Sequence, residues 1–232
     1  MMKVIEIHNL HKTYTESEVV VHAVNNVSLD FDEGEFAAIV GPSGSGKTTL
    51  LNMVGGLDSA TSGEVFVGGS KMSDLSGSEL TDFRMNNIGF VFQSYNLIPV
   101  LTAKENTEFV MRLQGKSSAE CETRTIELLN AVGLGERMNA RPNKLSGGQQ
   151  QRVAVARALA SKPKFVLADE PTANLDSAAT ETLLDIMEKL NREENITFIF
   201  STHDARVVKK ARRVITLEDG KIISDVRKNG GD

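Results

Sequence analysis

The stretch GPSGSGKTT, residues 41–49, lies between the apolar run EFAAIV and the helical sequence LLNMVGGL. It matches G-x-x-x-x-G-K-[ST] in the strand–loop–helix context that this motif requires. Its glycines let backbone N–H groups surround the β- and γ-phosphates of a nucleotide, and the helix start adds the positive end of its dipole. We therefore expect the whole loop to bind phosphate: Gly41, Pro42, Ser43, Gly44, Ser45, Gly46, Lys47, Thr48 and Thr49.

Four side chains in two segments predict the chemistry of this site. Lys47 supplies a point charge to the phosphates, and the Thr48 hydroxyl can ligate Mg²⁺. Asp169 and Glu170 end the apolar run KFVLAD, and ligands of open α/β sheets gather at the carboxyl ends of strands. Two adjacent buried carboxylates need a cation or a catalytic task. We expect Asp169 to hold Mg²⁺ through water and Glu170 to act as general base on the attacking water.

The apolar runs of the chain predict an α/β fold. Most of them are apolar throughout, which is typical of parallel strands covered on both faces. The earlier segments VIEIHNL, VNNVSLDF and GEVFVGG alternate more and predict a small antiparallel sheet. The runs expected to form the parallel sheet are residues 35–41, 88–92, 164–169, 196–202 and 213–219.

Strand signals vanish between about residues 94 and 160, and this segment reads as a helical subdomain inserted into the α/β core. In AECETRTIELLNAVG, Ile126, Leu129 and Val132 lie at helical spacing before Gly133, the expected helix end. We therefore expect one domain over residues 1–232, with an α/β core from 1–93 and 161–232 and the helical subdomain from 94–160.

The stretch LSGGQQQR, residues 145–152, begins another helix of this segment. Ser146 and Gln149 have the spacing of a capping box, in which side chains and backbone bond reciprocally at a helix start. Gly147 and Gly148 nevertheless occupy the first turn, where each glycine costs about 1 kcal/mol relative to alanine. The capping box alone does not explain glycines in so costly a position.

Four further residues are candidates by position. Gln93 and His203 each follow an apolar run, so they are expected at the carboxyl ends of strands. There Gln93 could reach Mg²⁺ or the attacking water, and His203 the γ-phosphate. Tyr14 is one of two tyrosines and can stack on adenine. Asp176 is a natural N-cap for the helix expected from residue 177.

Composition restricts the class of protein. The chain has 232 residues and a net charge of −5, which exerts no general attraction on nucleic acid or anionic lipid. Its basic run, residues 209–213, is expected to be a solvated helix end. The single cysteine excludes an intramolecular disulfide and fits a reducing compartment. No secretory signal or apolar run of bilayer length occurs, so we expect a cytosolic globular protein that reaches membranes only through a partner.

Taken together, the motifs resemble those of the ATP-binding-cassette ATPases. GPSGSGKT resembles the Walker A motif of that family, LSGGQ (residues 145–149) its signature, FVLADE (165–170) its Walker B motif and NLD (174–176) its D-loop. Gln93 resembles its Q-loop glutamine and His203 its switch histidine. The resemblance extends over residues 3–226. The segments 91–106 and 144–160 look like the cassettes of lipoprotein-releasing and macrolide-exporting systems, with departures at Ser94 and Ala173.

This resemblance implies a P-loop NTPase (RecA-like) fold and a definite assembly. ATP and Mg²⁺ are the implied cofactors, with Tyr14 stacked on adenine. Two copies of the chain would form a head-to-tail dimer around two ATP molecules, each held by the phosphate loop of one copy and the signature of the other: Ser146, Gly147, Gly148 and Gln149. Asp176 of the D-loop is also expected to bind the cofactor. A membrane permease would dock near residues 93–106, where Leu97, Ile98, Val100 and Leu101 are apolar. The chain would then lie on the cytoplasmic face of the membrane.

Three other functions are weighed against a transporter subunit. A non-transport cassette of the DNA-repair or translation type fits badly, because such proteins carry a long coiled-coil insertion or two cassettes. A regulatory nucleotide sensor without turnover is disfavoured by Glu170, the carboxylate that such proteins usually lose. A mechanotransmission system that pulls on periplasmic partners remains open. No nucleic-acid partner is expected, and the sequence does not identify a cargo.

Overall fold

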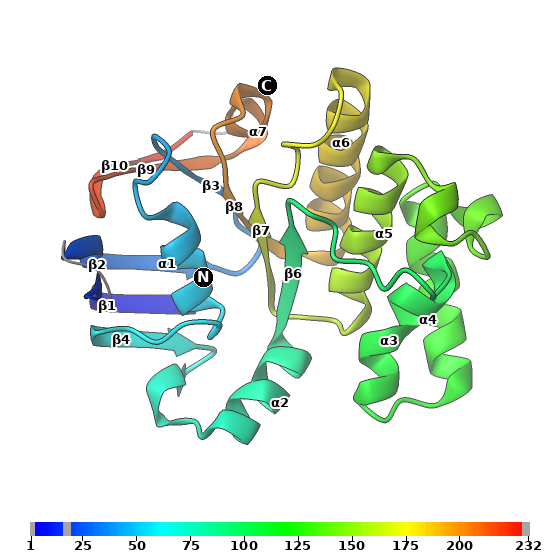
Figure 1. Ribbon diagram of the computed structural model, residues 1–232, viewed down its shortest axis with the longest axis horizontal. Helices are drawn as coiled ribbons and strands as arrows, with labels where there is room; N and C mark the ends of the chain where they lie inside the picture. Colours follow the sequence, from blue (N-terminus) through cyan, green and yellow to red (C-terminus); the bar gives the residue numbers. More distant parts are fainter. Residues whose placement is uncertain (1–2, 16–19, 229–232) are drawn as a thin grey trace.

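The computed structural model describes residues 3–15 and 20–228. Two β-sheets lie side by side, with α1 (Lys47–Val54) between them and a group of helices on the opposite side of the larger sheet (Figure 1). The order of elements confirms the α/β fold class, including an antiparallel sheet near the N-terminus and a helical region in the second half of the chain.

The larger sheet has six strands in the order β10-β9-β3-β8-β7-β6. The five consecutive strands from β9 to β6 are parallel to one another, as their apolar sequences predict. Their side chains alternate between two cores: Phe36 and Ala38 face one hydrophobic cluster, whereas Ala37 and Ile39 face the other. The strands of this sheet are β3 (Phe36–Val40), β6 (Ile88–Phe92), β7 (Phe165–Asp169), β8 (Thr197–Ser201), β9 (Arg213–Glu218) and β10 (Lys221–Arg227).

The last strand, β10, was not predicted. It pairs antiparallel with β9 and forms the edge of the sheet. Its sequence KIISDVR contains two polar residues besides its terminal basic ones, and Ile223 and Val226 remain exposed. An edge strand with one open face lacks the continuous apolar run that identified its neighbours.

The smaller sheet is antiparallel, with the order β2-β1-β4-β5. Its inward residues, including Ile5, Ile7 and Phe31, share a core with α1 and with one face of the larger sheet. This shared core holds the phosphate loop between the two sheets. The strands are β1 (Lys3–Tyr14), β2 (Val21–Asp32), β4 (Ser62–Val67) and β5 (Ser70–Lys71).

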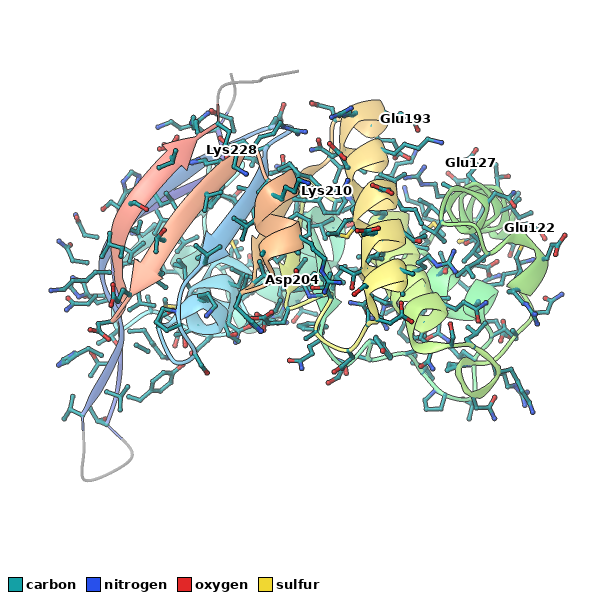
Figure 2. All side chains as sticks on the ribbon, turned by 90° about the horizontal axis from the view of Figure 1, so that it is seen from above. Glu122, Glu127, Glu193, Asp204, Lys210 and Lys228 are labelled. Carbon is teal, nitrogen blue, oxygen red and sulfur yellow. The ribbon has the colours of Figure 1, made fainter. Side chains whose placement is uncertain are left out.

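The helical region packs on the other face of the larger sheet (Figure 1). Its α4 helix ends as predicted, followed by Gly133 with φ +69°, but its predicted apolar face is partly wrong. Ile126 is 38% exposed, whereas the neighbouring Leu128 and Leu129 are buried. The acidic Glu122 and Glu127 lie on the outside of this helix (Figure 2). The main helices here are α3 (Ala103–Leu113), α4 (Ser118–Ala131), α5 (Gly147–Ala160) and α6 (Ser177–Glu194).

The prediction for the basic run 209–213 is wrong in its second half. Lys209 and Lys210 do form the last turn of α7 (Ala205–Lys210), and Lys210 pairs with Asp185 and Glu188 of α6. Arg213, however, begins β9 and is 6% exposed. Its guanidinium bonds Glu35 and Asp225, because a charge buried between strands needs partners.

Two short elements complete the chain before the helical region, namely a 3₁₀ turn (Met72–Asp74) and α2 (Gly77–Asn87). Two further 3₁₀ turns, Gly135–Arg137 and Pro142–Lys144, lead into α5. Within residues 3–15 and 20–228, none of the helices has both the length and the apolar character needed to span a bilayer.

Candidate functional site

The phosphate loop is shaped by two glycines that no other residue could replace. Gly41 has φ +154° and Gly46 has φ +101°. A Cβ atom on Gly41 would lie 2.0 Å from the Leu217 carbonyl oxygen, and one on Gly46 would lie 2.0 Å from the Ala23 carbonyl oxygen. The walls of the loop are thus backbone atoms of β9 and β2, which cannot move aside. Gly46 also precedes α1 without a capping side chain, so the first N–H groups of α1 remain available to an anion.

Lys47 and Thr48 begin α1 and point in different directions. The buried Lys47 ammonium donates to the carbonyl oxygens of Gly41 and Pro42, each at 2.9 Å. The Thr48 hydroxyl lies 3.0 Å and 3.1 Å from the two carboxylate oxygens of Asp169. The structure therefore joins the start of α1 to the end of β7, as the two sequence motifs suggested.

Glu170 follows β7 with a backbone held in the left-handed region, at φ +45°. Its Oε1 lies 2.8 Å from Nδ1 of His203, and its Oε2 accepts a hydrogen bond from the Thr202 hydroxyl at 3.3 Å. The Glu170 side chain is mostly buried, whereas His203 is largely exposed. A carboxylate held on both oxygens has a fixed orientation, and strained backbone of this kind is concentrated at functional sites.

A cleft of about 580 Å³ collects most of the candidates. It lies at the carboxyl ends of the parallel strands. Besides the predicted residues it includes Ala23 and Ala173, which lack polar side chains and so gave no chemical signal in the sequence. The predicted residues that line it are Gly41, Pro42, Ser43, Gly44, Gly46, Lys47, Thr48, Thr49, Gln93, Glu170 and His203.

The remaining candidates lie beside the cleft or away from it. Asp169 reaches it through Thr48, and the buried Ser45 hydroxyl lies within the loop without a hydrogen-bond partner among the described residues. Tyr14 ends β1, and its hydroxyl donates to the Asp58 carboxylate at 2.8 Å. Asp176 caps α6, accepting from the Ala179 N–H at 2.8 Å.

The signature segment does not line the cleft of its own chain. Its capping box is present, because Ser146 Oγ accepts from the Gln149 N–H and Gln149 Oε1 accepts from the Ser146 N–H. The structure also gives its glycines a reason within the chain. A Cβ atom on Gly147 would lie 2.7 Å from the Tyr95 hydroxyl, and one on Gly148 would lie 2.9 Å from Cβ of Ala179.

Gln93 is followed by a segment that is hydrogen-bonded to α5. Its carbonyl oxygen accepts from the Asn174 side chain at 3.0 Å, which joins it to the D-loop. Arg157 of α5 donates to the carbonyl oxygens of Tyr95 and Asn96, two consecutive residues with positive φ. The segment after Gln93 is therefore strained and is tied to the helix that carries the signature.

Asp204 connects the residues around His203 to those after Glu170. It caps α7 and accepts a hydrogen bond from the Thr172 hydroxyl at 2.9 Å (Figure 2 labels Asp204). Hydrogen bonds from the Arg206 guanidinium outweigh the effect of burial and lower the pKa of Asp204 to about 2. Asp204 is therefore a charged carboxylate that links the segment after Glu170, through Thr172, to the residue after His203.

Three features define a P-loop nucleoside triphosphatase. They are a phosphate loop at a helix start, an adjacent strand-end carboxylate and a second carboxylate held by a histidine. The sequence profile described as "ABC transporter" matches residues 24–173. The chain therefore belongs to the ABC transporter family, as an ATP-binding cassette that hydrolyses ATP.

Known relatives match over nearly the whole chain. The uncharacterized ABC transporter ATP-binding protein MJ0796 of Methanocaldococcus jannaschii is 47% identical over 232 residues, covering 98% of this chain and 99% of that protein. The macrolide export ATP-binding/permease protein MacB of Mannheimia succiniciproducens is 44% identical over 228 residues, covering 98% of this chain. The chain spans 35% of the length of that protein.

A solved structure supports the same relationship. It is the dimeric structure of a post-hydrolysis state of the ATP-binding cassette MJ0796 bound to ADP and Pi. Its TM-score with this chain is 0.89 at 44% identity, covering 98% of this chain and 100% of that chain.

Proposed function

We propose that two copies of this chain close head to tail around two ATP molecules and that their hydrolysis drives a conformational change in a membrane permease. The observation that carries the proposal is the separation of the two phosphate-binding segments within one chain. Ser146, Gly147 and Gly148 lie outside the cleft that residues 41–49 form. A second copy can bring its own signature to the open side of that cleft. The dimer described for MJ0796 supports this arrangement.

Within each site, the roles follow from the contacts of the side chains. Lys47 and the N–H groups at the start of α1 bind and orient the phosphates, and Tyr14 stacks on the adenine. Glu170 accepts a proton from the attacking water, while His203 holds its Oε1 and faces the γ-phosphate. Closure by the partner's Ser146 and glycine N–H groups excludes water and stabilises the charge that develops during transfer.

Mg²⁺ fits the donor set at the end of β7. No cluster of three or more His, Cys, Asp or Glu suited to a metal forms among the residues the structure describes. Mg²⁺ bound to nucleotides needs no such cluster, because phosphates and water supply most of its ligands. The Thr48 hydroxyl and the Asp169 carboxylate, 3.0 Å apart, and the Gln93 amide supply hard oxygen donors there. When bound, the ion neutralises phosphate charge.

The permease is proposed to dock on the helical subdomain, residues 94–160, beside the segment after Gln93. Of the four apolar residues expected there, Val100 is 72% exposed, whereas Leu97, Ile98 and Leu101 are half-buried. Two residues of α3, Phe109 and Leu113, are also exposed apolar side chains of this subdomain. A short cytoplasmic helix of a permease would fit this surface and would keep the chain on the cytoplasmic face of the membrane.

The partner is proposed to be of the macrolide-export or lipoprotein-release type. MacB combines a cassette and a permease in one chain, and the part that matches this chain covers 35% of it. The present chain would supply the same kind of cassette to such a permease. The nature of the cargo follows from the permease, so identifying that subunit by co-purification from membranes is the direct route to it.

Two variants test the dimer and the site together. Glu170→Gln removes the proposed base but keeps the size of the side chain, so ATP should accumulate in a stable dimer on size-exclusion chromatography. Lys47→Ala in the same background is the matched control and should remain monomeric because it no longer binds ATP. A Glu170→Gln chain that binds ATP but stays monomeric would contradict the head-to-tail proposal. Unchanged nucleotide affinity of Lys47→Ala would contradict the assignment of the phosphate loop.

A further inference from the structure

The Asp58 carboxylate, just beyond the end of α1, gathers three hydrogen-bond donors. The Tyr14 hydroxyl donates to its Oδ2 at 2.8 Å, and the Lys12 ammonium donates to its Oδ1 at 2.7 Å. The Ser59 N–H also donates to Oδ1, at 2.7 Å, and the Ser59 carbonyl oxygen accepts from Lys12 at 2.8 Å. These bonds join the end of β1 to the loop that follows the phosphate-binding helix.

The charges of this cluster are matched and largely withdrawn from water. The Lys12 side chain is 12% exposed and the Asp58 side chain 28% exposed, so their ion pair is shielded better than a surface pair. Burial opposes ionisation of Asp58, but hydrogen bonds from Lys12 and Tyr14 outweigh it and lower its pKa. Burial and the bond to Asp58 raise the pKa of Tyr14, so its hydroxyl remains a donor.

Lys12 also contacts the ring itself. Its Nζ lies over the Tyr14 ring, 4.9 Å from the centroid, within the range of a cation–π interaction. One face of the ring is therefore covered by an ammonium that Asp58 and the Ser59 carbonyl hold in place. Tyr14 nevertheless remains exposed, so part of the ring is open to a ligand.

We propose that Lys12 and Asp58 are positioning residues for the nucleobase: Asp58 fixes the Tyr14 hydroxyl, and Lys12 covers one ring face so that the other receives the adenine. This inference rests on the stacking role proposed above for Tyr14. The same carboxylate fixes the ring relative to the loop after α1, the helix that begins in the phosphate loop. The distance between the base and the phosphate loop is thereby set before a nucleotide arrives.

The test separates the base from the phosphates by using two probes, ADP and inorganic pyrophosphate, in isothermal titration calorimetry. Asp58→Ala should weaken ADP binding about three- to tenfold, the range that corresponds to one aromatic stacking interaction. Its affinity for pyrophosphate should not change. Lys12→Met, which keeps an apolar stem, should act in the same direction and serves if Asp58→Ala does not fold. Asp82→Ala, at an exposed aspartate of α2, is the control and should leave both affinities unchanged.

A double-variant cycle identifies the route of the effect. If Asp58 acts through the ring, Asp58→Ala should cost nothing further in a Tyr14→Ala chain. Equal losses for ADP and pyrophosphate would show a merely structural role and overturn the inference. So would normal ADP affinity in both Asp58→Ala and Lys12→Met while Tyr14→Ala binds weakly, an outcome that would leave the stacking role intact. Normal ADP affinity in Tyr14→Ala would overturn the stacking role and this inference with it.

Discussion

The first turn of α5 lies so close to α6 that adding a single methyl group there should measurably lower the stability of the chain. In Gly148→Ala, the new Cβ would lie 2.9 Å from Cβ of Ala179, whereas ordinary contacts begin at 3.4 Å. The two helices must therefore separate locally by about 0.5 Å, the difference between these distances. Overpacking of this kind costs about 1–3 kcal/mol, and alanine regains at most about 1 kcal/mol of helix propensity. We expect a net loss of about 1 kcal/mol, with an upper bound of about 2.

Urea denaturation of the single chain measures this loss, and thermal unfolding should show a decrease in Tm of about 2–4 °C. The matched control is Gly77→Ala at the first turn of α2, where an added Cβ meets nothing within 4 Å. That variant should be as stable as the parent or slightly more stable. In Gly148→Ala combined with Ala179→Gly, the clash is removed, so the two changes should couple by about 1 kcal/mol or more.

A Gly148→Ala chain as stable as Gly77→Ala would refute this reasoning. Contact with Ala179 would then not explain the glycine. The close approach of a partner's nucleotide would be its remaining explanation.

Two further predictions concern buried charges. Because hydrogen bonds from Arg206 hold the pKa of Asp204 at about 2, below its ordinary 3.8, this carboxylate stabilises the fold above pH 4 and less as the pH falls towards 2. Asp204→Asn should therefore lower the free energy of unfolding by at most about 2 kcal/mol at pH 7, because solvent screens the partly exposed Arg206, and by about half as much at pH 3. Urea denaturation at both pH values measures this difference. A loss that does not depend on pH would contradict the assignment. Arg213→Met should destabilise by up to about 3–5 kcal/mol, because it leaves the buried Glu35 carboxylate with only the largely exposed Arg227 as a partner. A loss below about 1 kcal/mol in the same assay would show that Arg227 and water replace the guanidinium.

The parallel strands and the phosphate loop were predictable because their signals are local. A run such as residues 164–169 carries its own apolar pattern, and the glycines of residues 41–49 occur at fixed spacing. The face of α4 was harder to predict. Ile126 and Leu128 are equally apolar, and only the packing of α3 and α5 decides that the second is buried.

The parts of the candidate site that escaped prediction depend on contacts between distant segments. Nothing in the sequence near Asp58 indicates that it bonds Tyr14, 44 residues away. The same holds for the contact of Gly148 with Ala179. Through the family resemblance, the two glycines of the signature suggested only closeness to another chain. The structure adds neighbours within the same chain, which the sequence could not identify because no local pattern links α5 to α6.

The capping box of the signature differs from three others in one hydrogen bond, the one that the capping hydroxyl donates. In three other boxes, the hydroxyl that caps the helix also donates its proton to the glutamate of the same box. These bonds are Ser76 to Glu79, Thr102 to Glu105 and Ser117 to Glu120. At Ser146 the third residue is Gln149, and within the described residues no bond uses the Ser146 proton.

A hydroxyl oxygen can accept through its lone pairs and donate its proton at the same time. Ser146 can therefore keep its helix capped while it donates to a phosphate held by another molecule, so the proposed dimer need not open the first turn of α5. The choice of an amide over a carboxylate three residues later has two effects. It leaves this proton uncommitted, and it keeps a negative charge away from a polyanion. One oxygen atom can then serve two chains simultaneously.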